Sequence, residues 1–317
     1  MLPVERTIRS RGFFLRRRDL LALGHTDGAI RRALRDRRVF RVRQGWYSVP
    51  GASSTGVLAV RVGGRLTSFS ALEDLGLRVP RQPNLHVAVR PTASRLRRST
   101  DRRARLLSGD RVTVHWTSTG TGGTPWRVSV AEALGAILAT ESRDVAIACC
   151  SAALRHKKIS RIALAAVFEN APMHARRWAA LPSAKDDSHG ETFFRLWTLD
   201  VGLVCEQQAY VHGVGHLDFR VSPNGYVEID GGQHDPSWTG DSPSSWEGDH
   251  DRDTTVTIDG GRTLRVTYRQ LYSDWPRVLA AVERMIADDL ALIAYRRRHP
   301  FRPVKRKRRR NPPKSGP

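Results

Sequence analysis

The chain has 317 residues and a formal net charge of +22, from 53 Lys and Arg against 31 Asp and Glu. Its length predicts two or three domains, and its 47 Arg against six Lys make nucleic acid the leading expected partner, because guanidinium groups bind phosphate in a bidentate manner. The sequence has neither an apolar run long enough to cross a membrane nor an apolar N-terminal signal segment, which predicts a cytoplasmic protein without a membrane partner.

Residues 1–50 predict a small helical unit. A first helix is expected over residues 18–23 and ends at Gly24, since glycine favours the left-handed cap. Thr26 is expected to cap a second helix, because its hydroxyl can accept a free backbone N–H of the first turn. The apolar residues that recur near the helical period of this second helix are Ile30, Leu34 and Val39.

The segment VFRVRQGWYSV alternates apolar and basic residues and predicts a two-stranded wing after the second helix. The arginines expected near a phosphate backbone are Arg31, Arg32, Arg35, Arg37, Arg38, Arg41 and Arg43. AIRRALR and RVRQGWYSVPG resemble the N-terminal winged-helix domain of AbiEi-type antitoxins. The resemblance covers residues 1–50 and implies a winged helix-turn-helix that binds nucleic acid. The alternative is a solvated arginine face that contacts only protein.

Residues 51–185 predict a middle α/β domain without a catalytic motif. HVAVR and RVTVHW alternate like strands, and VSVAEALGAILAT and VAIACCSAALRHKKISRIALAAVF predict helices. The opening stretch AVRVGGRLTSFSALEDLGL resembles the continuation of the same antitoxin family. STGTGGT, residues 118–124, lacks the Gly-Lys-Ser/Thr ending of a phosphate loop and is interpreted as a turn.

Residues 297–317 are rich in proline and cations and predict a disordered basic tail. We expect six consecutive cations in this tail to contact the phosphate backbone of nucleic acid. They are Lys305, Arg306, Lys307, Arg308, Arg309 and Arg310.

Residues 186–275 are acidic within this basic chain, with 16 Asp and Glu, six Arg and no Lys, a net charge of −10. GETFFRLWTLDVGL predicts a helix for which Ser188 or His189 is the expected cap. VCEQQAYV, HLDFRV and YVEIDG predict three short strands after it. The alternative is a solvated acidic surface or a disordered segment.

Three carboxylates in these strands predict a metal site. Glu228 and Asp230 are two residues apart, so in a strand they share one face. If the SPNG sequence forms a tight hairpin, Asp218 on the preceding strand faces the same way. Because opposed like charges repel and Mg²⁺ needs only two or three oxygen ligands from protein, Asp218 and Glu228 predict a site for Mg²⁺ or Mn²⁺.

VEIDGGQH and DHDRDTTVTIDGGRTLRVTYRQL, together with the residues before them, resemble the PD-(D/E)XK nuclease superfamily. Within it, the match is to the domain related to very-short-patch-repair endonucleases, over residues 186–286. The resemblance implies a mixed sheet flanked by helices and hydrolysis of phosphodiester bonds, with Asp218 and Glu228 as metal ligands. The catalytic residues that it implies are Asp218, Glu228, Asp230, His234 and Glu191, with Gln208 as a further matching position.

This chain departs from the superfamily pattern in its cations and its final strand. Asp230 stands where the superfamily has a lysine, and residues 186–304 contain no Lys. The resemblance gives His234 the role of activating water or steadying the leaving group, with an ordinary loop histidine as the alternative. Gly260 and Gly261 replace the family's Gly-Trp. For Glu191 the alternative is an acid in the first turn of a helix, where the helix dipole favours it.

The sequence thus predicts an α/β multidomain protein that binds DNA, expected to be double-stranded, and cleaves it with Mg²⁺. The expected divisions are a winged helix over 1–50, a middle domain over 51–185, an endonuclease-like domain over 186–296 and the tail. The alternative function is a non-catalytic, antitoxin-like regulator whose nuclease fold has degenerated.

Overall fold

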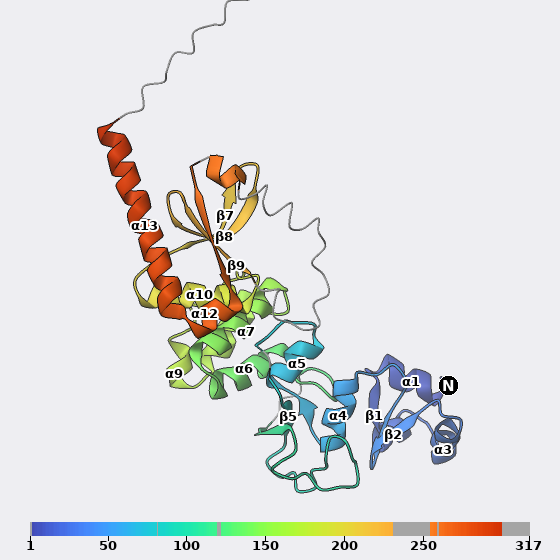
Figure 1. Cartoon of the computed structure of the whole chain (residues 1–317). Helices are drawn as coiled ribbons and strands as arrows, with labels where there is room; N and C mark the ends of the chain where they lie inside the picture. Colours follow the sequence, from blue (N-terminus) through green and yellow to red (C-terminus); the bar gives the residue numbers. More distant parts are fainter. Residues whose placement is uncertain (1, 81, 119–121, 231–253, 259, 300–317) are drawn as a thin grey trace, which may run out of the picture. The chain divides into compact units, whose positions relative to one another are not determined.

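The computed structural model describes residues 2–80, 82–118, 122–230, 254–258 and 260–299. By its contacts the chain divides into two compact units, Met1–Val201 and Gly202–Pro317. Helices combine with three open sheets (Figure 1), so the predicted α/β class is confirmed at this level. The finer domain boundaries at residues 50, 185 and 296 stay predictions.

The N-terminal part of the first unit contains three helices and a three-stranded sheet (Figure 1, blue). Its elements are α1 (Val4–Ser10), β1 (Phe14–Arg16), α2 (Arg17–Ala22), α3 (Asp27–Arg35), β2 (Phe40–Arg43) and β3 (Trp46–Ser48). Thr26 caps α3, since its hydroxyl accepts a hydrogen bond from the N–H of Ala29 at 3.2 Å. The predicted cap and hairpin are confirmed, whereas α1 and β1 are additions. Strand β1 pairs with β3, so the sheet has the antiparallel order β1-β3-β2.

Helix α3 presents one apolar face to a small core and one basic face to solvent. Ile30 and Ala33 are buried, whereas the arginines of α3 are exposed. The helix ends at Arg35, so Val39 lies beyond it and the expectation that it continues the helical period is wrong. Val39 still packs into this core, because the chain turns back at Arg37 (φ 57°). The buried members of the core are Val4, Ile8, Leu15, Leu20, Ile30, Ala33, Val39, Tyr47 and Val49.

The rest of the first unit is a second small sheet with packed helices. Its elements are α4 (Ser54–Val62), β4 (Arg65–Leu66), α5 (Ser68–Asp74), β5 (Leu85–Val89), β6 (Val112–Trp116), α6 (Val130–Thr140), α7 (Arg143–Arg155), α8 (Arg161–Glu169), α9 (Met173–Arg176) and α10 (His189–Asp200). Strand β5 lies between its antiparallel neighbour β4 and its parallel neighbour β6. The predicted strands β5 and β6 and the predicted helices α6, α7 and α8 are confirmed. Serine side chains cap α4, α6 and α8, which supplies acceptors for backbone N–H groups that have none inside the helix.

Helix α10 packs against α7 within this unit. Arg143 of α7 forms an ion pair with Asp200 of α10 at 2.6 Å. The indole N–H of Trp197 donates to Asp144 at 2.7 Å. Ser188, one of the two expected caps, caps the helix by accepting from the N–H of Glu191 at 3.1 Å.

The second unit contains a four-stranded mixed sheet of order β10-β9-β8-β7. Its elements are β7 (Glu206–Val211), β8 (Gly215–Ser222), β9 (Gly225–Asp230), β10 (Arg262–Thr267), α12 (Tyr268–Ser273) and α13 (Trp275–Arg298). Strands β7, β8 and β9 are antiparallel neighbours, whereas β10 is parallel to β9. The long helix α13 contacts β8 and β9 (Figure 1, red). Asp289 of α13 accepts hydrogen bonds from the backbone N–H and the amide of Asn224, at 2.9 and 2.7 Å, which ties the β8–β9 turn to the helix.

None of the helices in the described ranges combines the length and the apolar character that a membrane span requires.

Candidate active site

The two predicted metal ligands lie on neighbouring strands of the second unit. The antiparallel register pairs Phe219 of β8 with Val227 of β9. One position further along, the same register sets Asp218 across from Glu228. Phe219, Val227 and Ile229 are all buried, so Asp218 and Glu228 belong to the opposite face of the sheet, because side chains alternate along a strand. The predicted hairpin and the shared face of the two carboxylates are therefore confirmed.

The carboxylate of Asp218 is held against β9 by a backbone donor. The N–H of Ile229 donates a hydrogen bond to Oδ2 of Asp218 at 2.7 Å. Residue 229 follows Glu228 directly, so this bond places one oxygen of Asp218 beside the segment that carries the second carboxylate. Because a backbone N–H is fixed in position, it orients the side chain of Asp218 more rigidly than a long, flexible side-chain donor would.

An arginine completes this part of the sheet. The parallel register pairs Arg265 of β10 with Glu228 of β9, and their side chains form an ion pair at 3.1 Å. Only 12% of the Glu228 side chain and 27% of the Arg265 side chain are exposed. Arg265 is not among the residues predicted from the sequence, although a charged residue between the apolar Leu264 and Val266 of a strand is a usable signal.

The strand registers align four polar residues in one row across the sheet. Strand β7 pairs with β8 so that Gln207 meets Phe219 and Ala209 meets Leu217, which sets Gln208 across from Asp218. The row, called the polar row below, is Gln208, Asp218, Glu228 and Arg265. Gln208 has a positive φ of 54°, and its main-chain carbonyl oxygen lies 3.0 Å from Nδ1 of His216. This contact fixes the backbone of Gln208, and the role of its side chain stays a prediction.

The remaining predicted acids differ in their placement. Asp230 lies at the end of β9, two residues from Glu228 and paired with Thr267 of β10. Glu191 lies in α10, in the first unit, and its Oε2 accepts from the N–H of Asp187 at 2.9 Å. This contact agrees with the alternative for Glu191, in which an acid in the first turn stabilises the start of the helix.

The polar row offers ligands suited to magnesium. Among the described residues, no group of three or more His, Cys, Asp and Glu side chains is placed to hold a metal ion. Asp218 and Glu228 nevertheless fit Mg²⁺, which binds through one or two carboxylates and keeps several waters. They do not fit zinc, which takes three or four protein ligands and prefers nitrogen and sulfur.

Several predicted residues lie outside the described part of the chain. They are His234 and the tail residues Lys305, Arg306, Lys307, Arg308, Arg309 and Arg310. Their assigned roles in catalysis and phosphate contact therefore stay predictions.

The arginines predicted to bind nucleic acid fall into two groups. Arg31, Arg32 and Arg35 are exposed on α3, on the side opposite to its buried residues. Arg43 is half-buried and donates to the carbonyl oxygen of Arg95 at 3.1 Å, and burial lowers the pKa of its guanidinium. Arg43 thus holds two segments of the protein together, whereas the α3 arginines face solvent.

The other arginines of this region contact protein groups to different degrees. Arg41 lies over the ring of Tyr47, with its guanidinium carbon 5.9 Å from the ring centre. Arg38 pairs with Glu5 and Asp36, each at 2.8 Å. The charge of Arg38 is therefore partly neutralised within the protein, and α3 carries the stronger basic surface.

A pair of histidines, His86 buried and His115 half-buried, lies in the sheet of the first unit. His86 of β5 and His115 of β6 are neighbours in the parallel register, and Nδ1 of His86 lies 3.0 Å from Nε2 of His115. Burial, and then the proximity of His115, lowers the pKa of His86 to about 4. Burial also lowers the pKa of His115. The pair is therefore neutral at pH 7, with one ring donating its N–H to the other.

A search of protein-family models and of curated proteins found no match to this chain. The function is therefore inferred from the polar row, from the arginines of α3 and from the groups around them.

Proposed function

We propose that this protein binds DNA and hydrolyses its phosphodiester bonds with a divalent cation at the polar row. The observation that carries the proposal is the strand register that brings Asp218, Glu228 and Arg265 into one row. Two carboxylates on one face of neighbouring strands repel each other, and a cation between them removes that repulsion. This is also the arrangement implied by the resemblance to PD-(D/E)XK nucleases, to which we assign the second unit together with α10.

In this proposal Asp218 and Glu228 hold the cation, and Asp230 adds a carboxylate on the same face. Bound there, Mg²⁺ supplies Lewis-acid stabilisation of the charge that develops on a phosphoryl oxygen. The N–H of Ile229 fixes the orientation of Asp218. Arg265 holds Glu228 in place and brings a guanidinium near the site, where it can hydrogen-bond a phosphate oxygen. His234 keeps its proposed role in activating water or steadying the leaving group.

DNA binding is assigned to basic surfaces remote in sequence from the polar row. The exposed arginines of α3 support it, because phosphate contacts by Arg contribute most of the sequence-independent affinity for DNA. We assign residues 1–50 to a winged helix-turn-helix of the AbiEi type, with α3 as the helix that contacts the groove. The tail cations add electrostatic affinity.

A plasmid-nicking assay with the full-length protein tests the proposal. Supercoiled plasmid is incubated with Mg²⁺, Mn²⁺ or EDTA, and single-stranded DNA and RNA are tested in parallel. We expect cleavage only with a divalent cation and a decrease of at least about 100-fold for Asp218→Asn. The matched control is Glu206→Gln, which removes a carboxylate paired with Arg220 at 3.0 Å at the edge of the same sheet. Cleavage that persists in EDTA, or in Asp218→Asn, would contradict the proposal.

Two observations favour the alternative of a non-catalytic regulator. Glu228 already has a counter-charge in Arg265, and Asp230 replaces the lysine of the superfamily. A DNA-binding platform needs the sheet and its ion pair but no metal. Under this alternative, wild type and Asp218→Asn retard DNA equally in gel-shift experiments with Mg²⁺ or EDTA, and neither cleaves it.

A further inference from the structure

A cavity of about 520 Å³ lies in the first unit, between the small N-terminal sheet and the sheet that contains β5. Arg16 and Trp46 line it from β1 and β3, and Arg65 and Arg90 line it from β4 and the end of β5. The site is therefore assembled from segments far apart in the sequence. Its volume is that of a small-molecule site, and Arg90, directly after the carboxyl end of β5, is part of its lining.

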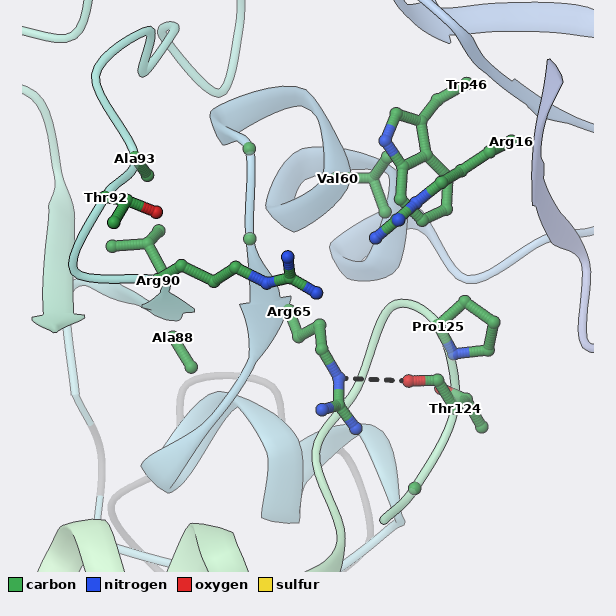
Figure 2. Close-up of a pocket in the computed structure, with 14 residues that line it drawn as sticks. Arg16, Trp46, Val60, Arg65, Ala88, Arg90, Thr92, Ala93, Thr124 and Pro125 are labelled. Atoms are coloured by element: carbon green, nitrogen blue, oxygen red, sulfur yellow. Dashed lines mark hydrogen bonds between the residues drawn. The ribbon is translucent and has the colours of Figure 1, made fainter. Parts of the chain in front are cut away.

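Three arginine side chains line this cavity. Figure 2 shows Arg16 and Arg90 turned towards each other, with Arg65 turned to the segment that carries Thr124. Arg16 lies over the ring of Trp46, with its guanidinium carbon 4.8 Å from the ring centre. Arg65 donates to the carbonyl oxygen of Thr124 at 3.1 Å. Trp46 and Thr124 thus fix two of the three guanidinium groups in place.

The lining has an electrostatic imbalance. The fourteen lining residues include three arginines and no Asp or Glu. Burial is the main cause that lowers the pKa of Arg16; the charges of Arg18 and Arg90 lower it further, and the charge of Asp19 opposes them. Among the described residues, the exposed side chain of Arg90 has no hydrogen bond or ion pair. Cations that face each other without an acid between them are stabilised by an anion that binds there.

The rest of the lining supplies an apolar floor. Val60, Ala88 and Val89 are buried and line the cavity beside the arginines. Gly64 also lines it, and its lack of a side chain serves packing against β5, because a Cβ atom at this position would come within 2.1 Å of the carbonyl oxygen of Ala88. A ligand with one anionic group and one less polar part fits this combination of cationic wall and apolar floor.

We propose that this cavity binds a nucleotide, with the phosphate held by Arg16 and Arg90 and the sugar or base placed over the apolar floor. Phosphate matches the ligand chemistry, because guanidinium groups bind its oxygens in a bidentate manner. Arg65 adds positive charge at the side of the cavity and keeps the segment that carries Thr124 in position. This site is separate from the polar row, and its occupancy does not depend on whether the polar row hydrolyses DNA.

Isothermal titration calorimetry with the full-length protein tests this site. The probes are inorganic phosphate, 5′-AMP and a dinucleotide with one internal phosphodiester. We expect 5′-AMP to bind wild type and Arg90→Ala to weaken that binding at least about tenfold. Arg90→Lys should fall between them, because an ammonium group keeps the charge but does not keep the bidentate geometry.

The matched control is Arg78→Ala, which removes an exposed arginine outside the lining. If Arg78→Ala weakens binding as much as Arg90→Ala, the affinity comes from overall charge and the site is refuted. Failure of all three probes to bind wild type also refutes it. Because Arg90 is exposed, its replacement should leave the melting temperature nearly unchanged, so weaker binding reports on the site itself.

The three probes also separate the two sources of a nucleotide. Binding of phosphate and 5′-AMP without the dinucleotide supports the site and identifies a free nucleotide as its ligand. Binding of the dinucleotide at least as tightly as 5′-AMP, with the same weakening in Arg90→Ala, supports the site and identifies the backbone of a nucleic acid chain.

Discussion

Like charges are brought together in both units, but the two units treat them differently. In the polar row, the protein itself supplies partners for the carboxylates, through the N–H of Ile229 and the guanidinium of Arg265. In the cavity of the first unit, Arg16 and Arg90 face each other, and no acid belongs to the lining. A charge with an internal partner can serve structure alone, whereas gathered charges without one point to an external ligand. The arginine cavity is therefore the firmer sign of ligand binding, and the polar row is the firmer sign of a built geometry.

The largest expected effect is on cleavage and tests whether the polar row also needs an external ion. Asp218→Asn should lower Mg²⁺-dependent cleavage at least about 100-fold, because one metal ligand is no longer charged. Mg²⁺ should also raise the melting temperature of wild type and not that of the variant, since an ion that binds only the folded state stabilises it by mass action. Without metal, the substitution should stabilise the protein by relieving like-charge repulsion. If both proteins have the same melting temperature with and without Mg²⁺, the polar row has only a structural role.

The second prediction concerns the exposed cations of α3. Replacing Arg31, Arg32 and Arg35 together by Ala should weaken DNA binding by about 10- to 100-fold. It should also reduce the slope of log affinity against log salt by about 0.9 for each phosphate that the variant no longer neutralises. Filter binding at several salt concentrations measures both. Arg38→Ala is the control, because Arg38 is already paired with Glu5 and Asp36. An unchanged slope in the triple variant would assign the α3 arginines to another surface.

The third prediction tests whether the negative charge of Glu228 is balanced only by Arg265 or also by a bound cation. Arg265→Met should lower the free energy of unfolding by about 3 kcal/mol, because it removes an ion-pair partner of a largely buried carboxylate. Adding Glu228→Met to it should restore much of that stability. Urea denaturation measures both steps. If the row binds metal, Mg²⁺ should recover part of the stability of Arg265→Met, and it should recover none in the double variant.

The fourth prediction concerns the pair of His86 and His115, both of which are uncharged at pH 7. The pKa of His86 is lowered to about 4 in the folded protein, against about 6.5 when unfolded. Stability from this group is fully present above pH 6.5 and is lost as the pH falls from 6.5 towards 4, because only the unfolded chain takes up the proton there. We expect a decrease of about 2 kcal/mol after allowing for solvent access. His86→Gln should flatten this part of the stability curve in urea titrations, and an unchanged curve would contradict the assignment.

The smallest expected effect is on the stability of the Arg90→Ala variant, and its sign is opposite to that expected for Arg265→Met. Arg90→Ala should change the unfolding free energy by no more than about 0.5 kcal/mol, with stabilisation expected, since it removes repulsion of Arg16 at an exposed position. A phosphate-containing buffer should raise the melting temperature of wild type more than that of this variant. Marked destabilisation by Arg90→Ala without ligand would show that Arg90 has a structural role, and the contrast between the two units would fail.

Local features of the fold were predictable because neighbouring residues determine them. Thr26, and either Ser188 or His189, were expected as helix caps, and Thr26 and Ser188 each accept a backbone N–H of the first turn. The β8–β9 hairpin and the shared face of Asp218 and Glu228 followed from strand alternation and a tight turn. Strands β1 and β4 were missed, since short strands carry little periodicity and gain their stability from partners. Val39 was placed on a helix that ends at Arg35, because its burial alone does not distinguish a helix from the segment after it.

The sequence by itself determined the α/β class, the excess of arginine, the caps and the pair of carboxylates, because each depends on composition or on residues within one turn or hairpin. Only the tertiary structure decided that Arg265 meets Glu228. This contact requires the parallel pairing of β9 and β10, and no hairpin joins these two strands. It alone also brought Arg16 and Arg90 into one cavity. The pairing of distant segments depends on the burial of the whole core, and no local pattern encodes which charges it will bring together.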